Sequence, residues 1–358
     1  MKSWVTLALL ALATTAWAHK ATVTKFTYNA DVFPIFATKC GSCHRTGGVA
    51  PMSLLSYKEA YPWGVSIKNE VLNLAMPPWF ADERYGAFKH GAGLSAKEMN
   101  TIVDWCLGGS PEGDTPKGDS APDSGGWSLG EPEVELAMPS PVVLDEGTSE
   151  ALEEVTFETG LASTVYIRAF DFRPGAQNIV RSAIIFVDGE EQPIATWIPG
   201  QLPEALPAGR GHALPAGADI KMRVHYKKTW LSEGTAVEDQ SVLAIYLEGS
   251  DSAKSVDTVA VTAGSAHMVE RDAELVALLP RVATVVESVV AELVRPDGSR
   301  ERILRLYQPD PDWPRKYWLE EPIALLSGSR IEVNVVNVAS VTASEDAAPV
   351  ILLDLVSE

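Results

Sequence analysis

Cysteines and basic residues are scarce in this chain, and each shortage narrows what it can do. Three cysteines in 358 residues are an odd number for a framework of disulfides. The 29 lysines and arginines against 48 aspartates and glutamates give a net charge of −19. That balance argues against binding to nucleic acids or anionic membranes, and favours basic partners or solubility alone. No apolar run beyond the amino terminus resembles a transmembrane helix, and no catalytic triad order, phosphate-binding glycine loop or paired-carboxylate signature stands out.

Two of the three cysteines lie in the run CGSCH, from Cys40 to His44, the pattern of a covalent c-type haem attachment site. In such a site, the thiols of Cys40 and Cys43 add to the two vinyl groups of one haem. The imidazole of His44 then becomes the proximal ligand of the iron. The Cys-x-x-Cys pair alone also fits a thioredoxin-like dithiol or half of a zinc site. We expect one covalent haem c.

The amino terminus predicts export. Lys2 precedes an apolar run from Trp4 to Trp17, and small residues occupy the two cleavage-site positions, Ala16 and Ala18. We therefore expect a signal peptide over residues 1–18, cleavage after Ala18, and a periplasmic or otherwise exported protein. An uncleaved anchor is less favoured, because the run is short for a membrane span. Bacteria attach haem to such motifs outside the cytoplasm, so export and motif agree.

Composition divides the mature chain into a helical part and a β-rich part. We expect a haem domain over residues 19–108, a flexible linker over 109–126 rich in Gly, Ser, Pro and Asp, and β-sandwiches over 127–250 and 251–358. The predicted fold class is an all-α domain followed by an all-β double sandwich. Residues 19–114 contain nine basic and nine acidic side chains. With Lys2 set aside, the linker and β region therefore carry a net charge of −20.

Periodicity and turn residues locate the expected elements. Helices are predicted at 31–40, 57–61, 65–75 and, after the capping-box pattern Ser95-x-x-Glu98, at 96–107, where Cys106 falls on the buried stripe. Strands are predicted at 164–172, 179–187, 220–226, 242–247, 285–294, 303–306, 331–338 and 350–355, with a hairpin turn at 296–299.

The haem iron needs a sixth ligand or an open position, and methionine is a common partner of histidine in electron transfer. Met76 is favoured because Pro77 and Pro78 fix the backbone after it. Met99 already belongs to the apolar face of a helix, and Met52 follows His44 too closely to reach the opposite face of the porphyrin. His90 is the competing ligand, although its neighbours suggest a solvated loop.

Several spaced motifs in the first part resemble the monohaem cytochrome c module of bacterial exported proteins. They are Phe33 to Phe36 (FPIF), the haem motif with Arg45 to Gly48 (RTGG), Ala50 to Leu54 (APMSL), Met76 to Trp79 (MPPW) and Gly108 to Gly113 (GGSPEG). The resemblance covers about residues 31–113. It implies that Met76 is the distal haem ligand.

The second part resembles, more weakly, the domain pair of copper type II, ascorbate-dependent monooxygenases, the group that includes peptidylglycine hydroxylase. The similarity lies at 126–132, 172–175, 197–200, 225–226 and 295–299, and it implies two jelly-roll-like sandwiches. The copper ligands of that family are mostly missing. Arg181-Ser182 stands where a His-His pair is expected, and Arg281 and Ala283 where a His-x-His pair is expected; no methionine follows Met268.

His225, the one copper ligand that this resemblance retains, shares a strand face with Lys221, Arg223 and Lys227, which disfavours a dication. It is therefore interpreted as a surface or structural histidine. His212 and His267 are too dispersed to rebuild a site, and His19, at the expected mature terminus, is interpreted as incidental. Copper is not expected.

The sequence thus predicts single-electron transfer through a His44/Met76 haem, with the β region as a docking or assembly scaffold. The expected partner is a redox protein, with a membrane-bound electron-transfer complex as one candidate. The alternative is a haem-fed, copper-dependent monooxygenase. A third hypothesis, a gas sensor or peroxidase, requires an open iron position.

Overall fold

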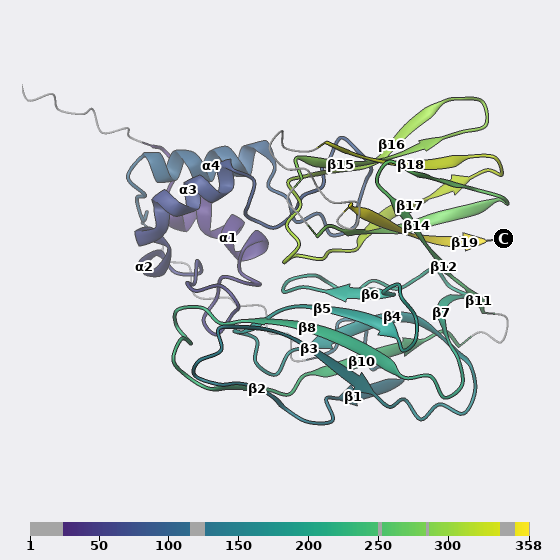
Figure 1. Cartoon of the computed structure of the whole chain (residues 1–358). Helices are drawn as coiled ribbons and strands as arrows, with labels where there is room; N and C mark the ends of the chain where they lie inside the picture. Colours follow the sequence, from purple (N-terminus) through teal and green to yellow (C-terminus); the bar gives the residue numbers. More distant parts are fainter. Residues whose placement is uncertain (1–23, 115–125, 250–252, 284–285, 337–347, 358) are drawn as a thin grey trace, which may run out of the picture.

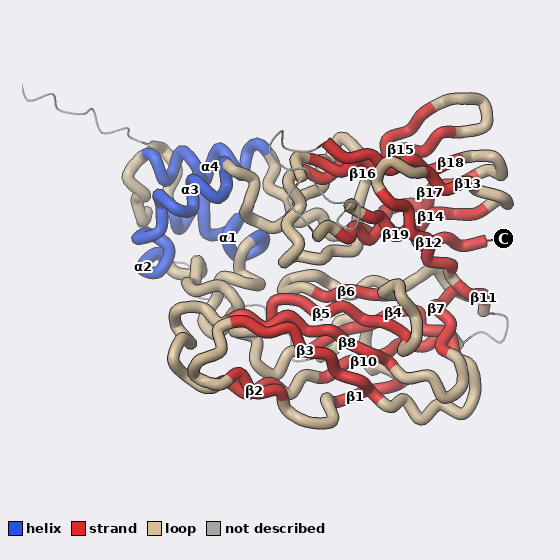
Figure 2. The backbone as a smooth tube through the Cα atoms, in the orientation of Figure 1, coloured by secondary structure: helices blue, strands red, loops and turns tan. Residues whose placement is uncertain are grey.

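The computed structural model describes residues 24–114, 126–249, 253–283, 286–336 and 348–357 (Figure 1). The predicted signal peptide and His19 lie outside the described residues, as does most of the predicted linker. Figure 2 shows helices gathered at one end of the molecule and strands in two stacked regions beside them. Within the described part of the chain, no helix is long and apolar enough to cross a membrane.

The helices are short, and the longest has 12 residues. They are η1 (Tyr28–Val32), α1 (Phe33–Lys39), α2 (Tyr57–Ala60), η2 (Tyr61–Trp63), α3 (Gly64–Leu72) and α4 (Ala96–Leu107). The capping box of α4 is confirmed: Ser95 Oγ accepts from the backbone N–H of Glu98, and the Glu98 carboxylate accepts from the backbone N–H of Ser95. An apolar cluster joins these helices around the fully buried Tyr28 and Trp105, and Cys106 is partly buried against it, as its helical position predicts.

The first β region consists of two main sheets and a small two-stranded one. One sheet has the order β1-β10-β4-β7-β11, a second has the order β3-β8-β5-β6, and β2 pairs with β9. The bounds are β1 (Val134–Ala137), β2 (Val142–Leu144), β3 (Glu150–Phe157), β4 (Val165–Arg173), β5 (Val180–Val187), β6 (Ala195–Trp197), β7 (Arg210–Leu214), β8 (Ile220–Lys227), β9 (Val237–Asp239), β10 (Val242–Leu247) and β11 (Lys254–Ser255). Side chains from both main sheets form one core, as in a sandwich. In β8 every second residue is buried, which confirms the predicted alternation.

The second β region has two four-stranded sheets, with the orders β12-β19-β14-β17 and β13-β18-β15-β16. The bounds are β12 (Asp257–Thr262), β13 (Ala266–Met268), β14 (Ala273–Arg281), β15 (Ser288–Val294), β16 (Arg300–Tyr307), β17 (Tyr317–Leu325), β18 (Arg330–Val336) and β19 (Val350–Ser357). The predicted hairpin turn is confirmed: Arg295 N–H donates to the Ser299 carbonyl at 2.9 Å, and Gly298 has φ +85°. A second apolar core lies between these sheets.

The prediction of an all-α cytochrome c domain over residues 19–108 was wrong. The molecule is mostly β-sheet with a few short helices, and residues 73–95, between α3 and α4, lie outside the helices. Ala81 then bridges to Leu306 of β16, and Phe88 bridges to Leu319 of β17, so this segment packs into the core of the second β region. The physical reason is that burial against a large sheet core removes more apolar surface from water than a short helix pair does. The predicted domain boundaries stay predictions.

Candidate functional site

The turn that contains both motif cysteines is formed directly on the carboxyl end of α1. The Cys40 and Gly41 N–H groups donate to the Phe36 carbonyl at 3.0 and 2.7 Å, and the His44 N–H donates to the Cys40 carbonyl at 2.8 Å. The backbone is tightly packed here, since a Cβ on Gly41 would lie 2.9 Å from the Ala37 carbonyl oxygen. Glycine is therefore required between the two cysteines for this turn to rest on α1.

The His44 ring is oriented by one backbone contact. Its Nδ1 lies 3.1 Å from the Met52 carbonyl oxygen. A carbonyl oxygen only accepts hydrogen bonds, so Nδ1 carries the proton and Nε2 keeps its lone pair. Burial lowers the pKa of His44, which keeps the imidazole neutral near neutral pH. This is the protonation state and the second hydrogen bond that metal-ligating histidines typically have. The sequence indicated His44 but gave no signal for its carbonyl acceptor.

The two thiols lack the properties of a reactive dithiol. Burial is the main cause that raises the pKa of Cys40 to about 12, and burial also raises the pKa of Cys43. Reactive cysteine pairs have a lowered pKa instead. The Cys43 thiol lies 3.5 Å from the Pro199 carbonyl oxygen, so it faces the first β region. Cys40, Cys43 and His44 are not part of the one group of three or more possible metal ligands that lies within 4.8 Å in the described residues.

Met76 lines a pocket next to the helices. Met99, Leu94, Trp79 and Pro77 line the same pocket, so two thioethers are available there. Met52 lines a different pocket, against the loop Thr229–Ser232. Met76 and Met99 thus line one pocket and Met52 lines another, although Met52 and Met99 pack against the same apolar cluster.

His90, the competing ligand, is engaged elsewhere. Its Nε2 pairs with the Glu204 carboxylate, which also accepts from Lys89 Nζ at 3.0 Å. The contact with Glu204 links the loop after Phe88 to the first β region, and it disfavours His90 as a haem ligand.

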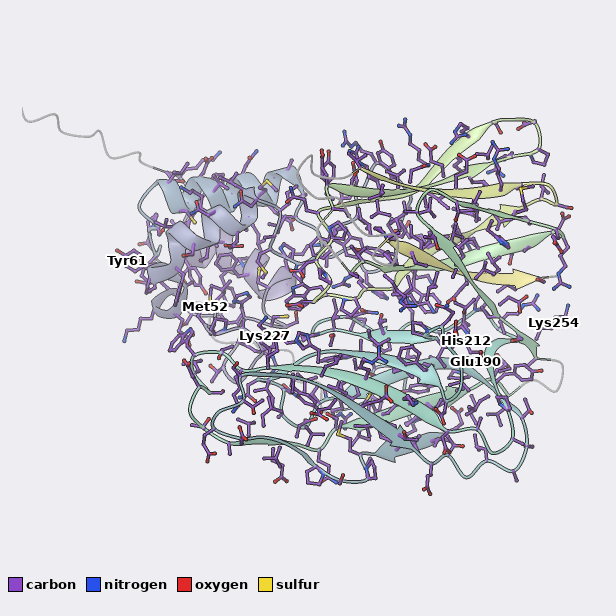
Figure 3. The ribbon with its side chains drawn as sticks, in the orientation of Figure 1. Met52, Tyr61, Glu190, His212, Lys227 and Lys254 are labelled. Carbon is purple, nitrogen blue, oxygen red and sulfur yellow. The ribbon has the colours of Figure 1, made fainter. Side chains whose placement is uncertain are left out.

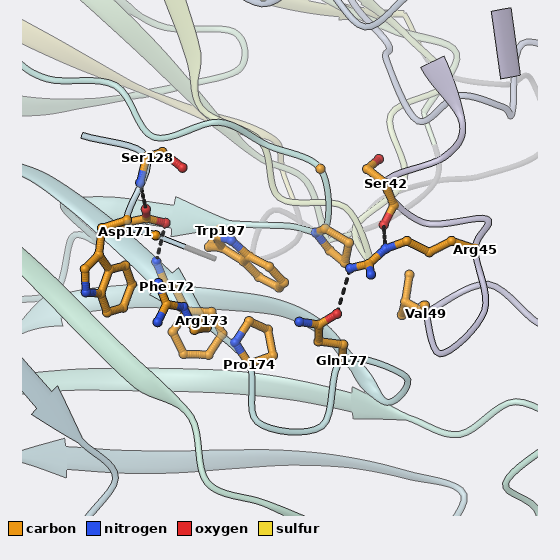
Figure 4. A pocket seen from close by; sticks show the side chains of 15 residues that line it. Ser42, Arg45, Val49, Ser128, Asp171, Phe172, Arg173, Pro174, Gln177 and Trp197 are labelled. Carbon is orange, nitrogen blue, oxygen red and sulfur yellow. Dashed lines mark hydrogen bonds between the residues drawn. The ribbon is translucent and has the colours of Figure 1, made fainter. Parts of the chain in front are cut away.

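The loop after the cysteines is seated on the first β region. Arg45 donates to the Gln177 side chain at 2.6 Å and to the Ser42 carbonyl at 3.3 Å, as Figure 4 shows. A Cβ on Gly200 would collide with the Ser42 side chain, so the two segments touch closely. Ser42, Arg45, Gln177 and Gly200 line one pocket between the two segments, and Trp197 lines it as well.

Two arginines approach Cys43 from different β regions. Arg181 lies on β5, and Arg315 precedes β17; both lower the pKa of the Cys43 thiol against the larger effect of burial. Arg315 is buried, and its guanidinium carbon lies 5.3 Å from the centre of the Trp79 ring. The Nε atoms of both arginines and Nε1 of Trp79 are buried without a hydrogen-bond partner in the described part of the chain. The sequence marked Arg181 only as a missing copper ligand, and it gave no signal for Arg315.

A second group of polar side chains consists of Glu150, His225 and Asp312. Their ligand atoms lie within 4.8 Å of one another, and His225 Nε2 lies 2.7 Å from Glu150 Oε1. Lys227 Nζ lies 3.4 Å from both Glu150 Oε2 and Asp312 Oδ2. An ammonium group thus already pairs with the two carboxylates, which agrees with a structural interpretation of His225 and disfavours a cation there.

No family model and no curated protein matches this chain. Among solved structures, the major capsid protein of bacteriophage PM2 is similar at 10% identity and a TM-score of 0.29, over 63% of this chain and 97% of that one. A xanthan lyase from Paenibacillus is similar at 10% identity and a TM-score of 0.20, over 68% of this chain and 28% of that one. The tandem CBM22 domains of Xyn10C from Paenibacillus barcinonensis are similar at 7% identity and a TM-score of 0.17, over 62% of this chain and 92% of that one. At these TM-scores the likeness carries no argument about fold or function.

These comparisons correct the family assignment made from sequence motifs. A monohaem cytochrome c module fused to a copper monooxygenase-like pair is not supported, because no family model matches and the expected all-α domain is absent from the described residues. Short motifs such as Met76 to Trp79 (MPPW) and Phe172 to Gly175 (FRPG) contain proline and glycine, which also end helices and strands in unrelated chains. Such motifs are therefore not sufficient to assign a family.

Proposed function

We propose that this chain is an exported, single-haem redox protein that transfers one electron at a time. Cys40 and Cys43 would hold the haem through thioether bonds, His44 would be the proximal iron ligand, and Met76 the distal one. The observation that carries the proposal is the half-buried His44 ring, whose Nδ1–H is fixed by the Met52 carbonyl so that Nε2 is free to bind a metal. Bound haem would supply a one-electron iron couple.

The residues around the motif support this chemistry in separate ways. The turn on α1 holds both thiols and the imidazole within five residues, and burial keeps the thiols protonated until they are modified. Met76 and Trp79 offer a thioether and an aromatic ring on one pocket.

The β regions would act as a docking or assembly scaffold in a larger redox complex. The loop after the cysteine motif contacts the first β region through the Arg45–Gln177 hydrogen bond. A partner that docks on the first β region beside Gln177 would therefore lie near the redox centre. Because the linker and β region carry a net charge of −20, we expect a partner surface that is basic. The partner would be another redox protein, and a membrane-bound electron-transfer complex fits that role.

Covalent haem attachment is tested by producing the chain in a host that exports it and ligates haem. The denatured protein should keep one haem per chain, by its pyridine haemochrome spectrum and by mass. Cys40→Ala with Cys43→Ala should lose it, whereas Cys106→Ala should keep it, since Cys106 lies on α4 outside the motif. A wild-type protein without covalent haem in a competent host would refute the proposal. The same preparation should begin at His19.

The distal ligand is tested by the methionine–iron charge-transfer band in the oxidised spectrum. Met76→Ala should remove the band, and Met99→Ala, from the same pocket, should leave it. Loss of the band in Met99→Ala alone would reassign the ligand. An unchanged band in both variants would contradict ligation from this pocket.

A further inference from the structure

The two arginines beside Cys43 are held in an arrangement that the protein alone does not complete. Arg315 is 8% exposed and Arg181 is half-buried. Each has a buried Nε without a hydrogen-bond partner in the described residues, and so has Nε1 of Trp79, whose ring lies under the Arg315 guanidinium. Three unpaired donors in one neighbourhood are unusual, because a buried N–H without an acceptor costs about 1–3 kcal/mol.

The charges near these arginines do not explain the arrangement. Arg181 has Glu150 and Asp312 in its surroundings, but both carboxylates are paired with Lys227, and Glu150 also with His225. Arg315 lies over the ring of Trp79, and no ion pair between Arg315 and a carboxylate is found among the described residues. Burial lowers the pKa of both guanidinium groups, so burial disfavours their charged form. The unpaired N–H groups need an acceptor, and an anion would in addition balance the two guanidinium charges.

Haem itself provides anions of the right kind. It has two propionate carboxylates on the edge of the macrocycle, and guanidinium groups bind carboxylates through paired, charge-assisted hydrogen bonds. We propose that Arg181 and Arg315 bind the haem propionates, so that one residue from each β region closes the haem site opened by the Cys40–His44 turn. This inference rests on the proposed function, since it requires haem at Cys43.

Two consequences follow from that arrangement. The arginine charge near the haem favours the reduced iron, which carries one positive charge less, and so raises the reduction potential. The same contacts would tie both β regions to the haem, so that haem binding stabilises the whole assembly. The β regions would then be parts of the cofactor site as well as a docking surface.

The test is a spectroelectrochemical titration of the purified haem-loaded protein and its variants. Arg181→Gln and Arg315→Gln should each lower the reduction potential, and the double variant should lower it further. Arg181→Lys and Arg315→Lys should recover part of the shift, because they restore the charge without the planar fork. The matched control is Arg302→Gln, which removes the same charge from an exposed side chain on β16 and should leave the potential unchanged.

A second measurement separates this role from a purely structural one. In the haem-loaded protein, Arg315→Gln should lower the unfolding temperature. In the haem-free Cys40→Ala/Cys43→Ala chain it should raise it, because a buried, unmatched charge is removed. Potentials of both glutamine variants equal to wild type, or an unfolding temperature lowered in both backgrounds, would overturn the inference while leaving the haem intact. A wild-type chain without haem would instead refute the proposed function.

Discussion

At the scale of single residues, the structure separates side chains that are paired from side chains that lack a partner. Nε2 of His225 and Nε2 of His90 each contact a glutamate carboxylate, so these nitrogens are already engaged. His44 is instead held by a backbone carbonyl that orients it and leaves one nitrogen available. The buried donors of Arg315 and Trp79 are unpaired in the described residues. Buried polar atoms without a hydrogen-bond partner also occur elsewhere in the described residues, at Arg305 and Ser329 for example, but those of Arg181 and Arg315 belong to residues whose charge acts on Cys43.

His212 gives a residue-scale prediction about pH. It is buried between the β regions, facing Asp354 and Lys316, and burial lowers its pKa to about 4 (Figure 3). The unfolded chain, with a histidine pKa near 6.5, therefore binds more protons between pH 6.5 and about 4. The free energy of unfolding that neutral His212 contributes is fully present above pH 6.5. It decreases as the pH is lowered from 6.5 to about 4, by about 3 kcal/mol in all.

Urea unfolding at several pH values checks this expectation. His212→Gln should flatten the loss of unfolding free energy between pH 6.5 and 4.5, while the slope due to other groups remains. Equal slopes for the variant and the wild type would show that His212 does not titrate as its burial requires.

At the scale of elements, local patterns in the sequence located the four α-helices but only eight of the nineteen strands in the described residues. The alternation in Ile220–Lys227 and the capping box before α4 are local features, so they could be read directly. The short strand β11 and the bridges of Ala81 and Phe88 could not, because they depend on partners more than two hundred residues away or on parallel pairing. The meeting of Arg181 and Arg315 near Cys43 was hidden for the same reason. The cysteine motif is also a local pattern, and the haem that it predicts stays a prediction.

The capping box of α4 leads to an element-scale prediction. Ser95→Ala should lower the free energy of unfolding by about 1 kcal/mol, because the N–H of Glu98 loses its acceptor at the helix start. The matched control is Ser56→Ala, since Ser56 precedes α2 without a side-chain cap to the backbone and should change the free energy by less than about 0.5 kcal/mol. Urea titrations of both variants measure these free energies. Equal losses in Ser95→Ala and Ser56→Ala would contradict the prediction.

At the scale of the whole molecule, the two β regions meet across a mixed interface. One part is apolar, formed by Leu206 with Val256, Val276 and Val356. The other part is charged: Lys316, before β17, pairs with Asp354 of β19 and donates to the Ile194 carbonyl of the first region at 2.8 Å. Both charged side chains are almost fully buried, at 5% and 2% exposure. Such a pair favours one relative placement of the regions, because any other placement leaves a buried charge unmatched.

Removing one member of this pair should therefore destabilise the assembly strongly. Lys316→Met leaves the Asp354 carboxylate buried with Thr258 Oγ1, at 2.9 Å, as its one hydrogen-bond donor among the described residues, and with a neutral His212 nearby. We expect a loss of about 3–5 kcal/mol in unfolding free energy. Adding Asp354→Asn should recover most of that loss, because the unmatched charge disappears with it. The control is Lys221→Met, the same substitution at a partly exposed lysine of β8 that pairs with Glu154 and Asp188 at 3.3 and 3.1 Å; it should cost less than about 1 kcal/mol. If Lys316→Met costs no more than Lys221→Met, the charged pair does not hold the two regions together, and the apolar contacts of Leu206 and Val256 must suffice.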